Sequence, residues 1–401
     1  TTTATTPDYA TPVAKRKHEG HSWLFKALLF GVFFDASMIA MNTTQFLMLP
    51  IKLAGLVVPA FGSVYTKGIQ YTKGCFGTLL ILVTQWFAPT KFTITYEGTD
   101  NPGEVFELDE AGNVVGLKLP EKTVIMSNHQ VYTDWWYLWS LLYFANAHDA
   151  VLIILKKSLK HIPVIGWGMQ FFRFIFLARN WAKDKGPLGE HIVDVAREAQ
   201  AADSKLALMI FPEGTLVSKD TRPLSKKYAD KVGISDMQHT LLPRSTGLHY
   251  ILRAMAPSIP DLQLLDLTVG YPGIPPAGYG QDYYTLRSVF FQGVAPPAIH
   301  IHMRLTPVSQ LPIGTVAARS SSSGADIAAS ADPSSEETAQ FDEWLRGRWT
   351  EKDNLMDGFY KDGHFSAREG AGILSVKGEI PIRIRNWWEV GNAVCFLAPV
   401  V

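Results

Sequence analysis

The chain contains 401 residues, of which 47% are hydrophobic and 18% are charged. Soluble globular proteins average about a quarter charged residues, so this composition favours contact with a membrane. The 37 Lys and Arg residues balance 37 Asp and Glu residues, and a neutral chain of this kind gives no global indication of nucleic-acid binding. Two cysteines, Cys75 and Cys395, are too few for a disulfide framework and fit a reducing compartment.

The first ninety residues combine a polar tail with apolar segments. Residues 1–22 are rich in Thr, and the stretch 23–49 is apolar and long enough to cross a bilayer. A second, shorter apolar stretch covers 75–89. We therefore predict a helical membrane pair within 23–90 that either spans the bilayer or re-enters it. The basic cluster at 15–17 places the N-terminus on the cytosolic side.

From residue 91 onward, short apolar stretches alternate with helical ones. This alternation predicts an α/β fold in which helices flank a central sheet. Helices are expected over 134–146, 187–202 and 244–254. The expected strands cover 91–98, 122–128, 151–155, 174–178, 206–211, 263–271 and 298–308.

Changes in composition divide the chain into six segments. The catalytic α/β domain is the longest of them, and a Ser- and Ala-rich, low-complexity insertion follows it. The segments are a polar tail (1–22), membrane helices (23–90), the α/β domain (91–315), the flexible insertion (316–338), a helical extension (339–385) and the start of a C-terminal membrane segment (386–401).

A polar motif follows the apolar stretch that ends at Ser127. Asn128, His129 and Asp134 fall within seven residues of one another. On one continuous helix the side chains of His129 and Asp134 would lie about 140° apart, so they can pair only across a strand-to-helix turn. A His paired with a carboxylate through one ring nitrogen keeps the other free to act as a general base. The alternative is a purely structural helix start with Asp134 as its N-cap.

A second motif, Phe-Pro-Glu-Gly-Thr, ends the buried stretch 206–211. It places Glu213 at a strand end, where the sites of α/β proteins lie. Gly214 permits a positive φ or a close approach of backbone to ligand. Taken alone, Pro-Glu-Gly is an ordinary turn.

Together, His-x4-Asp followed by Phe-Pro-Glu-Gly-Thr resembles the glycerolipid acyltransferases, which include the 1-acylglycerol-3-phosphate and lysophospholipid acyltransferases. The resemblance implies a glycerol-3-phosphate acyltransferase-like α/β fold with a mixed sheet and extends over roughly 90–315 and 340–365. Further blocks are similar to one subgroup, the eukaryotic lysocardiolipin, lysophosphatidylglycerol and fungal lysophosphatidylinositol acyltransferases. These blocks are 241–248, 264–272, 300–307 and 341–360. The stretch 172–181 resembles the second block of the whole family, with Arg179 at its basic position.

The resemblance and the chemistry of the residues imply a mechanism. His129 removes the proton from the free hydroxyl of a lysophospholipid, and Asp134 orients His129. The lipid oxygen attacks the thioester of acyl-CoA, which is a co-substrate, and no cofactor is expected. His300 and His302 share a strand face but have no third ligand of clear spacing, so no metal is expected. Backbone N–H groups near Gly214 and Thr215 are candidate donors to the oxyanion. The predicted substrate-binding residues are Asn128, Arg179 (to phosphate), Glu213, Gly214, Thr215 and Arg244.

The sequence departs from the common form of the family at Leu216, where many members carry Arg. This departure favours a diester headgroup such as inositol over the phosphate monoester of lysophosphatidic acid, which remains the alternative acceptor. A membrane lipid hydrolase and an inactive lipid-binding scaffold are more distant alternatives. The resemblance also implies the endoplasmic reticulum membrane, with the catalytic domain facing the cytosol. The sequence indicates no oligomeric state.

Overall fold

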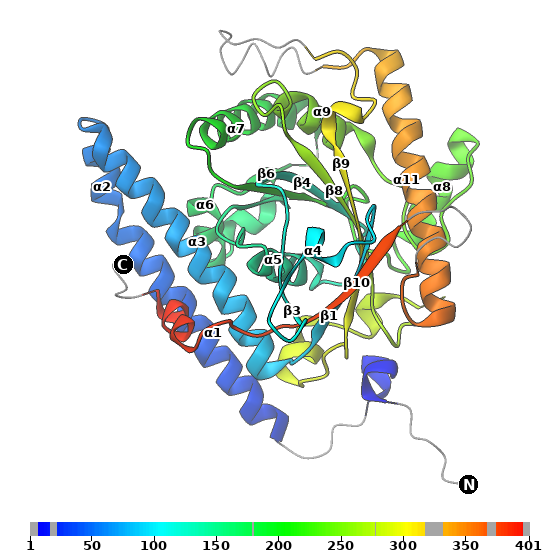
Figure 1. Cartoon of the computed structure of the whole chain (residues 1–401), viewed down its shortest axis with the longest axis horizontal. Helices are drawn as coiled ribbons and strands as arrows, with labels where there is room; N and C mark the ends of the chain where they lie inside the picture. The colour runs from blue at the N-terminus through cyan, green and yellow to red at the C-terminus, as the bar shows by residue number, and fades with distance from the viewer. Residues whose placement is uncertain are drawn as a thin grey trace.

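The computed structural model describes residues 7–16, 22–178, 180–276, 278–316, 332–366 and 374–395. In this part of the chain, helices flank a central eight-stranded sheet (Figure 1). Its strands are β1 (Lys91–Glu97), β4 (Lys122–Ser127), β5 (Val151–Lys156), β6 (Ile175–Leu177), β7 (Leu206–Ile210), β8 (Gln263–Gly270), β9 (Ile299–Pro307) and β10 (Ser375–Pro381). They lie in the order β10-β1-β9-β8-β4-β7-β5-β6. A two-stranded ribbon adds β2 (Phe106–Leu108) and β3 (Val114–Leu117).

The middle of the sheet is parallel. β4 pairs with β7 on one side and with β8 on the other, and Met126 aligns with both Ile210 and Asp266. The segments that follow Ser127, Ile210 and Gly270 therefore leave the sheet at the same edge, where α/β proteins place their sites. The pairs β8–β9 and β1–β10 are antiparallel. The predicted mixed sheet flanked by helices is confirmed.

Strand β10 lies in the segment 339–385, for which the sequence predicted only helix. Its side chains alternate between buried and exposed, and Val376 and Ile380 are buried. Lys, Gly, Glu and Pro occupy most of its other positions, and these residues are depleted in strands, so composition concealed the alternation. The extension is thus a long helix followed by an edge strand.

Some helices lie in the stretches that the sequence indicated, and those at 102–105, 165–171 and 222–232 were not predicted. The three helices expected over 134–146, 187–202 and 244–254 are present with shifted bounds. The helices are α4 (Pro102–Val105), α5 (Asp134–Phe144), α6 (Ile165–Phe171), α7 (Trp181–Ala201), α8 (Arg222–Val232), α9 (Ser245–Met255) and α11 (Ser335–Asp362), with 3-10 turns η3 (Lys157–His161) and η7 (Trp387–Val394).

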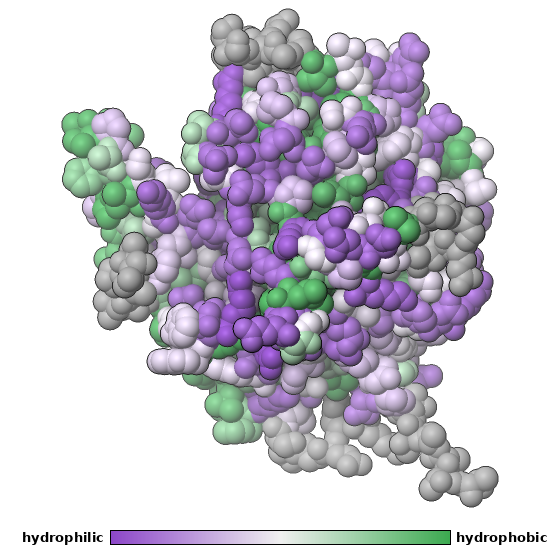
Figure 2. Space-filling model, in the orientation of Figure 1, coloured by the Kyte–Doolittle hydropathy of each residue, from purple (hydrophilic) through white to green (hydrophobic). Residues whose placement is uncertain are grey.

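An N-terminal helical arm projects from the α/β domain. It consists of α1 (Ser22–Leu47), α2 (Leu49–Gly55) and α3 (Pro59–Phe87). In the described residues one helical region, Trp23–Gly55, is long and apolar enough to cross a membrane. Apolar residues gather at the projecting end of the arm in Figure 2, where the exposed fractions of Leu56 and Val57 are 81% and 84%.

The second predicted membrane segment, 75–89, has a different environment. It forms the C-terminal half of α3, which is buried against the α/β domain. The indole Nε1 of Trp136 donates to Thr84 at 2.9 Å, and the rings of Phe76 and Trp139 lie 4.8 Å apart. This part of the predicted membrane pair is therefore core, because its apolar surface is covered by α5 instead of lipid.

Described segments near the two ends of the chain also pack on the fold. Within the predicted polar tail, Arg16 is buried and its Nη2 donates to the carbonyl oxygen of Tyr283 at 2.6 Å. The predicted C-terminal membrane segment is described only as far as Cys395, and η7 within it contacts α1 and α3. Most of the predicted insertion over 316–338 lies outside the described residues, and α11 begins within its last residues.

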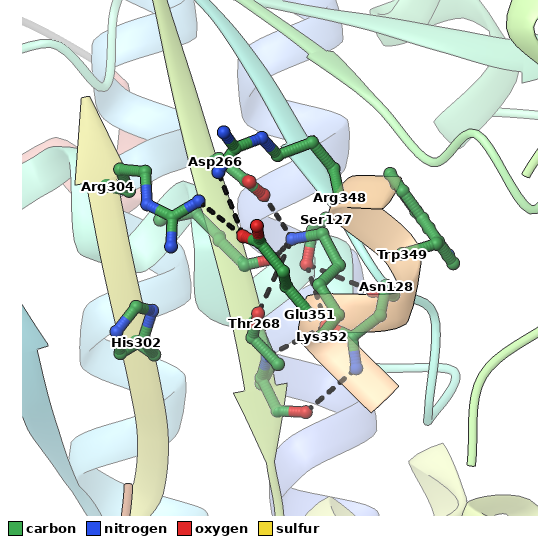
Figure 3. A network of polar contacts seen from close by, with 12 residues as sticks. Ser127, Asn128, Asp266, Thr268, His302, Arg304, Arg348, Trp349, Glu351 and Lys352 are labelled. Carbon is green, nitrogen blue, oxygen red and sulfur yellow. Dashed lines mark hydrogen bonds and ion pairs between the residues drawn. The ribbon is translucent and has the colours of Figure 1, made fainter. Parts of the chain in front are cut away.

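A buried ion pair fixes α11 on the sheet. The ammonium of Lys352 is almost inaccessible to solvent and donates to the Asp266 carboxylate and, at 2.6 Å, to the carbonyl oxygen of Leu267. Figure 3 shows Lys352 reaching from α11 to Asp266 and Thr268 of β8. Beside it, Arg304 of β9 contacts Glu351 of α11 at 2.7 Å. Removal of one partner would leave the other charge buried and unpaired.

We therefore expect Lys352→Met to lower the free energy of unfolding by about 3–5 kcal/mol. The double variant Lys352→Met/Asp266→Leu should be more stable than Lys352→Met, since it removes both buried charges. Denaturant unfolding of the purified proteins measures both values. Lys226→Met, which removes an exposed pair with Asp230, is the control and should change stability little. Equal stability of the single and double variants would contradict this view of the pair.

Candidate active site

The turn between β4 and α5 brings His129 and Asp134 together. The Nδ1 atom of His129 lies 2.7 Å from Oδ2 of Asp134. The same oxygen accepts hydrogen bonds from the backbone N–H groups of Gln130 (2.7 Å) and Val131 (3.0 Å). The N-cap position belongs to Thr133, so Asp134 binds the preceding turn instead of capping α5. The pairing across a strand-to-helix turn therefore exists, and the catalytic roles of the two residues stay predictions.

The ring of His129 faces a cavity. It stacks on Phe211 with ring centroids 4.4 Å apart, and its side chain is 19% exposed. With Nδ1 engaged by Asp134, Nε2 is the nitrogen left to exchange a proton with a ligand. Asp134 itself is fully buried. This is the arrangement of a general base held in one orientation by a carboxylate.

Glu213 ties three separate segments together. Its Oε1 accepts hydrogen bonds from the backbone N–H of His129 (3.1 Å) and from the indole of Trp349 on α11 (3.4 Å). Its Oε2 accepts from the backbone N–H of Leu241 at 3.1 Å. Burial raises the pKa of the carboxyl to about 8, while the backbone donors act in the opposite direction. Glu213 is buried and does not line the cavity.

Asn128 makes a similar connection between strands. Its Nδ2 donates to the carbonyl oxygen of Val269 at 3.0 Å, and its Oδ1 accepts from the N–H of the same residue at 2.8 Å. This amide pairing fastens the end of β4 to the end of β8. Asn128 is fully buried and, like Glu213, does not line the cavity. Its geometry is that of a positioning residue, and a substrate contact would require it to move.

Gly214 and Arg244 lie beside His129 on the cavity wall. Gly214 has a φ of +73°, which accounts for glycine in this turn, and its N–H donates to the carbonyl oxygen of Phe211 at 2.9 Å. That N–H is thus committed to the turn and is a poor candidate for the oxyanion donor. Arg244 is exposed, and a Cβ at position 214 would stand 3.7 Å from its Nε. Thr215 does not line the cavity.

Two predictions concern basic residues near this motif. Leu216, which stands where many family members carry Arg, is buried and so faces away from solvent. Arg179, predicted to contact phosphate, lies outside the described residues. Among the described residues that line the cavity, the Lys and Arg side chains are Lys156 and Arg244.

The cavity has a volume of about 840 Å³ and a largely apolar wall. It extends from His129 toward the helical arm, where Met38 of α1 and Phe76 of α3 line it. The volume lies within the usual range of about 300–1,000 Å³ for small-molecule sites. Two aromatic segments of the sequence, 135–144 and 166–176, contribute to its wall through Trp135, Trp139, Gly168, Met169, Phe172 and Phe174.

Comparison with known proteins identifies the family of this chain. The Acyltransferase family profile matches residues 113–271. An uncharacterized acyltransferase of Schizosaccharomyces pombe is 37% identical over 75% of this chain and 77% of its own length. A 2-acyl-1-lysophosphatidylinositol acyltransferase of Saccharomyces cerevisiae is 35% identical over 74% of this chain and 76% of its own. Lysocardiolipin acyltransferase 1 of Gallus gallus is 29% identical over 77% of this chain and 73% of its own length.

The chain belongs to the acyltransferase family. The predicted family and enzyme class are thereby confirmed. Sequence reasoning missed two residues of the site, Tyr271 and Trp349, which bind Asp134 and Glu213. Both lie in the blocks 264–272 and 341–360, but no spacing in the sequence links them to the motifs.

Glu213→Gln tests the role of the buried carboxylate. The amide NH2 must face one of the backbone donors, so we expect stability to fall by about 1–3 kcal/mol at neutral pH. The pKa of Glu213 is raised from 4.5 to about 8 on folding. The wild type therefore loses stability as pH rises through this window, and the Gln variant lacks this loss.

The difference in unfolding free energy between wild type and Glu213→Gln should therefore shrink as pH rises from about 5 to about 8. Denaturant unfolding of both proteins at several pH values measures it. Because all other titrating groups are shared, their contributions cancel in the difference. A difference that stays constant across this range would contradict the raised pKa.

Proposed function

We propose that the chain transfers an acyl group from acyl-CoA to the free hydroxyl of a lysophospholipid, and that lysophosphatidylinositol is the favoured acceptor. The observation that carries the proposal is a His129–Asp134 pair whose His129 lines a largely apolar cavity of about 840 Å³. A polar catalytic group in the wall of an apolar cavity suits two substrates that each carry a fatty chain.

The reaction requires His129 to accept one proton from the lipid hydroxyl and then to donate it to the leaving CoA thiolate. Nε2 of His129 takes the proton of the lipid hydroxyl, and the lipid oxygen bonds to the thioester carbon. The carbon–sulfur bond then breaks, and the CoA thiolate leaves with the proton from the imidazolium. No acyl-enzyme is needed. In the described part of the chain, no Ser or Cys lines the cavity, and Cys75 is buried in α3.

The site and the relatives support the choice of acceptor. A guanidinium binds phosphate oxygens well, and Arg244 lies beside Gly214 and lines the same cavity as His129. It is therefore our candidate for the headgroup phosphate, in place of the Arg that Leu216 replaces. Relatives named as lysophosphatidylinositol acyltransferases occur in Saccharomyces cerevisiae and, at 30% identity, in Caenorhabditis elegans.

Lysophosphatidic acid is the second candidate acceptor. An Arabidopsis thaliana relative, 28% identical over 62% of this chain, is named as a probable 1-acyl-sn-glycerol-3-phosphate acyltransferase. Arg244 suits a phosphate monoester as well as a diester, so the site alone does not separate the two.

We further propose that the helical arm places the enzyme in the endoplasmic reticulum membrane, with the α/β domain on the cytosolic side. The apolar residues of Trp23–Gly55 support insertion. Met38 of α1 lines the cavity, so fatty chains from the bilayer have a route along the arm. On η7, Trp387 is 80% exposed, and exposed Trp is typical of a membrane interface.

The proposal is tested by CoA-thiol release from oleoyl-CoA and stearoyl-CoA with a panel of lysophospholipids. The panel holds both positional isomers of lysophosphatidylinositol, together with lysophosphatidic acid and lysocardiolipin, and products are identified by mass. We expect release that depends on lysophosphatidylinositol and falls at least a hundredfold in His129→Ala. Release without any acceptor would favour a hydrolase, and activity retained by His129→Ala would contradict the mechanism.

Arg244→Gln should raise the KM for the lysophospholipid about tenfold or more, since a charge-assisted hydrogen bond is lost. The KM for acyl-CoA should stay near the wild-type value. Arg244→Lys keeps the charge but loses the bidentate geometry of the guanidinium. Its KM for the lysophospholipid should lie between those of the wild type and Arg244→Gln. Steady-state kinetics measure the three enzymes, with Lys227→Gln on the exposed face of α8 as control. A rise in the KM for acyl-CoA alone would assign Arg244 to the other substrate.

A further inference from the structure

Asp134 has a fourth hydrogen-bond donor that lies far away in the sequence. The hydroxyl of Tyr271 donates to Oδ1 of Asp134 at 2.6 Å. The three other donors, from His129 and two backbone N–H groups, all reach Oδ2. Tyr271 is therefore the donor that fixes the second oxygen of the carboxylate, and with it the rotation of the carboxylate plane toward His129.

The fold holds Tyr271 firmly in this place. It follows directly on β8, whose end is fastened to β4 by the pairing of Asn128 with Val269. The ring of Tyr271 is packed 5.9 Å from that of Tyr284, whose own hydroxyl donates to a backbone carbonyl oxygen, that of Pro272, and takes no part in the bond to Asp134. Burial raises the pKa of Tyr271 well above its ordinary value, so the phenol stays protonated and donates.

We propose that Tyr271 is a positioning residue for catalysis, which sets the orientation and the effective charge of Asp134 and thereby the basicity of His129. This proposal rests on the proposed function, in which His129 is the general base. A structural tyrosine would only add stability. A tyrosine bonded to the carboxylate that pairs with the base must also change how that base responds to pH.

The direction of the change follows from charge. The Tyr271 hydroxyl disperses part of the negative charge of Asp134 toward Oδ1. Without this donor, more of the negative charge of Asp134 faces His129 and stabilises the imidazolium. His129 then stays protonated, and unable to act as a base, up to a higher pH. The other titratable groups around Asp134 are Tyr137 of α5 and Glu213 after β7. Neither is bonded to the carboxylate of Asp134, and the substitution changes neither.

The experiment compares Tyr271→Phe with the wild type in the pH dependence of kcat/KM for lysophosphatidylinositol acylation. We expect the acid limb to move up by about half a pH unit or more, and kcat to fall about tenfold with both KM values unchanged. Tyr284→Phe is the matched control. It loses one buried phenol hydrogen bond of the same length from a neighbouring ring, but that bond goes to a backbone carbonyl. Its acid limb should coincide with that of the wild type.

A second substitution keeps the ring and the hydroxyl, so that folding is preserved. Site-specific replacement of Tyr271 by 3,5-difluorotyrosine makes the phenol a stronger donor, and the acid limb should move to lower pH. Opposite shifts in the two variants support the proposal. Acid limbs that coincide with the wild type in both variants, or an equal shift in Tyr284→Phe, would overturn it. Failure of the proposed function would be visible earlier, as a wild type without acyl transfer or an active His129→Ala.

Discussion

The site depends on one buried carboxylate. Asp134 is inaccessible to solvent, and a buried charge is tolerated only when hydrogen bonds or an opposite charge compensate it. Two backbone N–H groups, a phenol and an imidazole supply that compensation. To reach Asp134, the chain must turn sharply between β4 and α5, and this turn presents His129 to the cavity. The carboxylate thus stabilises the turn through its backbone hydrogen bonds and also pairs with the base.

The other polar residues of the two motifs hold the backbone around His129 and Asp134 in place. Parallel pairing of β4 with β7 and β8 brings three strand ends to one edge. Asn128 fastens β4 to β8, and Glu213 fastens the loop after β7 to the backbone of His129. The long helix α11 contributes Trp349, whose indole donates a hydrogen bond to Glu213. Most polar residues of the two motifs therefore hold the backbone in place. Among the described residues of the predicted site, those that line the cavity are His129, Gly214 and Arg244.

Contacts between residues close in the sequence could be predicted here, but contacts between residues far apart in the sequence could not. The pairing of His129 with Asp134 was predictable because four intervening residues fit one turn after a strand. The contacts of Tyr271 and Trp349 join residues more than a hundred positions apart, which no periodicity or spacing records. Helix α3 was misread for another reason. Its apolar half would look the same whether covered by lipid or by α5, and only the fold decides which.

Asp134→Asn tests the central claim most directly. The amide preserves the shape of the side chain, and its oxygen keeps the Oδ2 place, where the two backbone N–H groups donate. The side chain then carries no charge, so the imidazolium that His129 must form loses its buried ionic partner. The measurement is kcat of the purified full chain for acyl transfer to lysophosphatidylinositol, with thermal unfolding to verify the fold. Our account predicts a folded enzyme whose kcat falls about a thousandfold or more. A folded Asp134→Asn protein with near-wild-type turnover would contradict it.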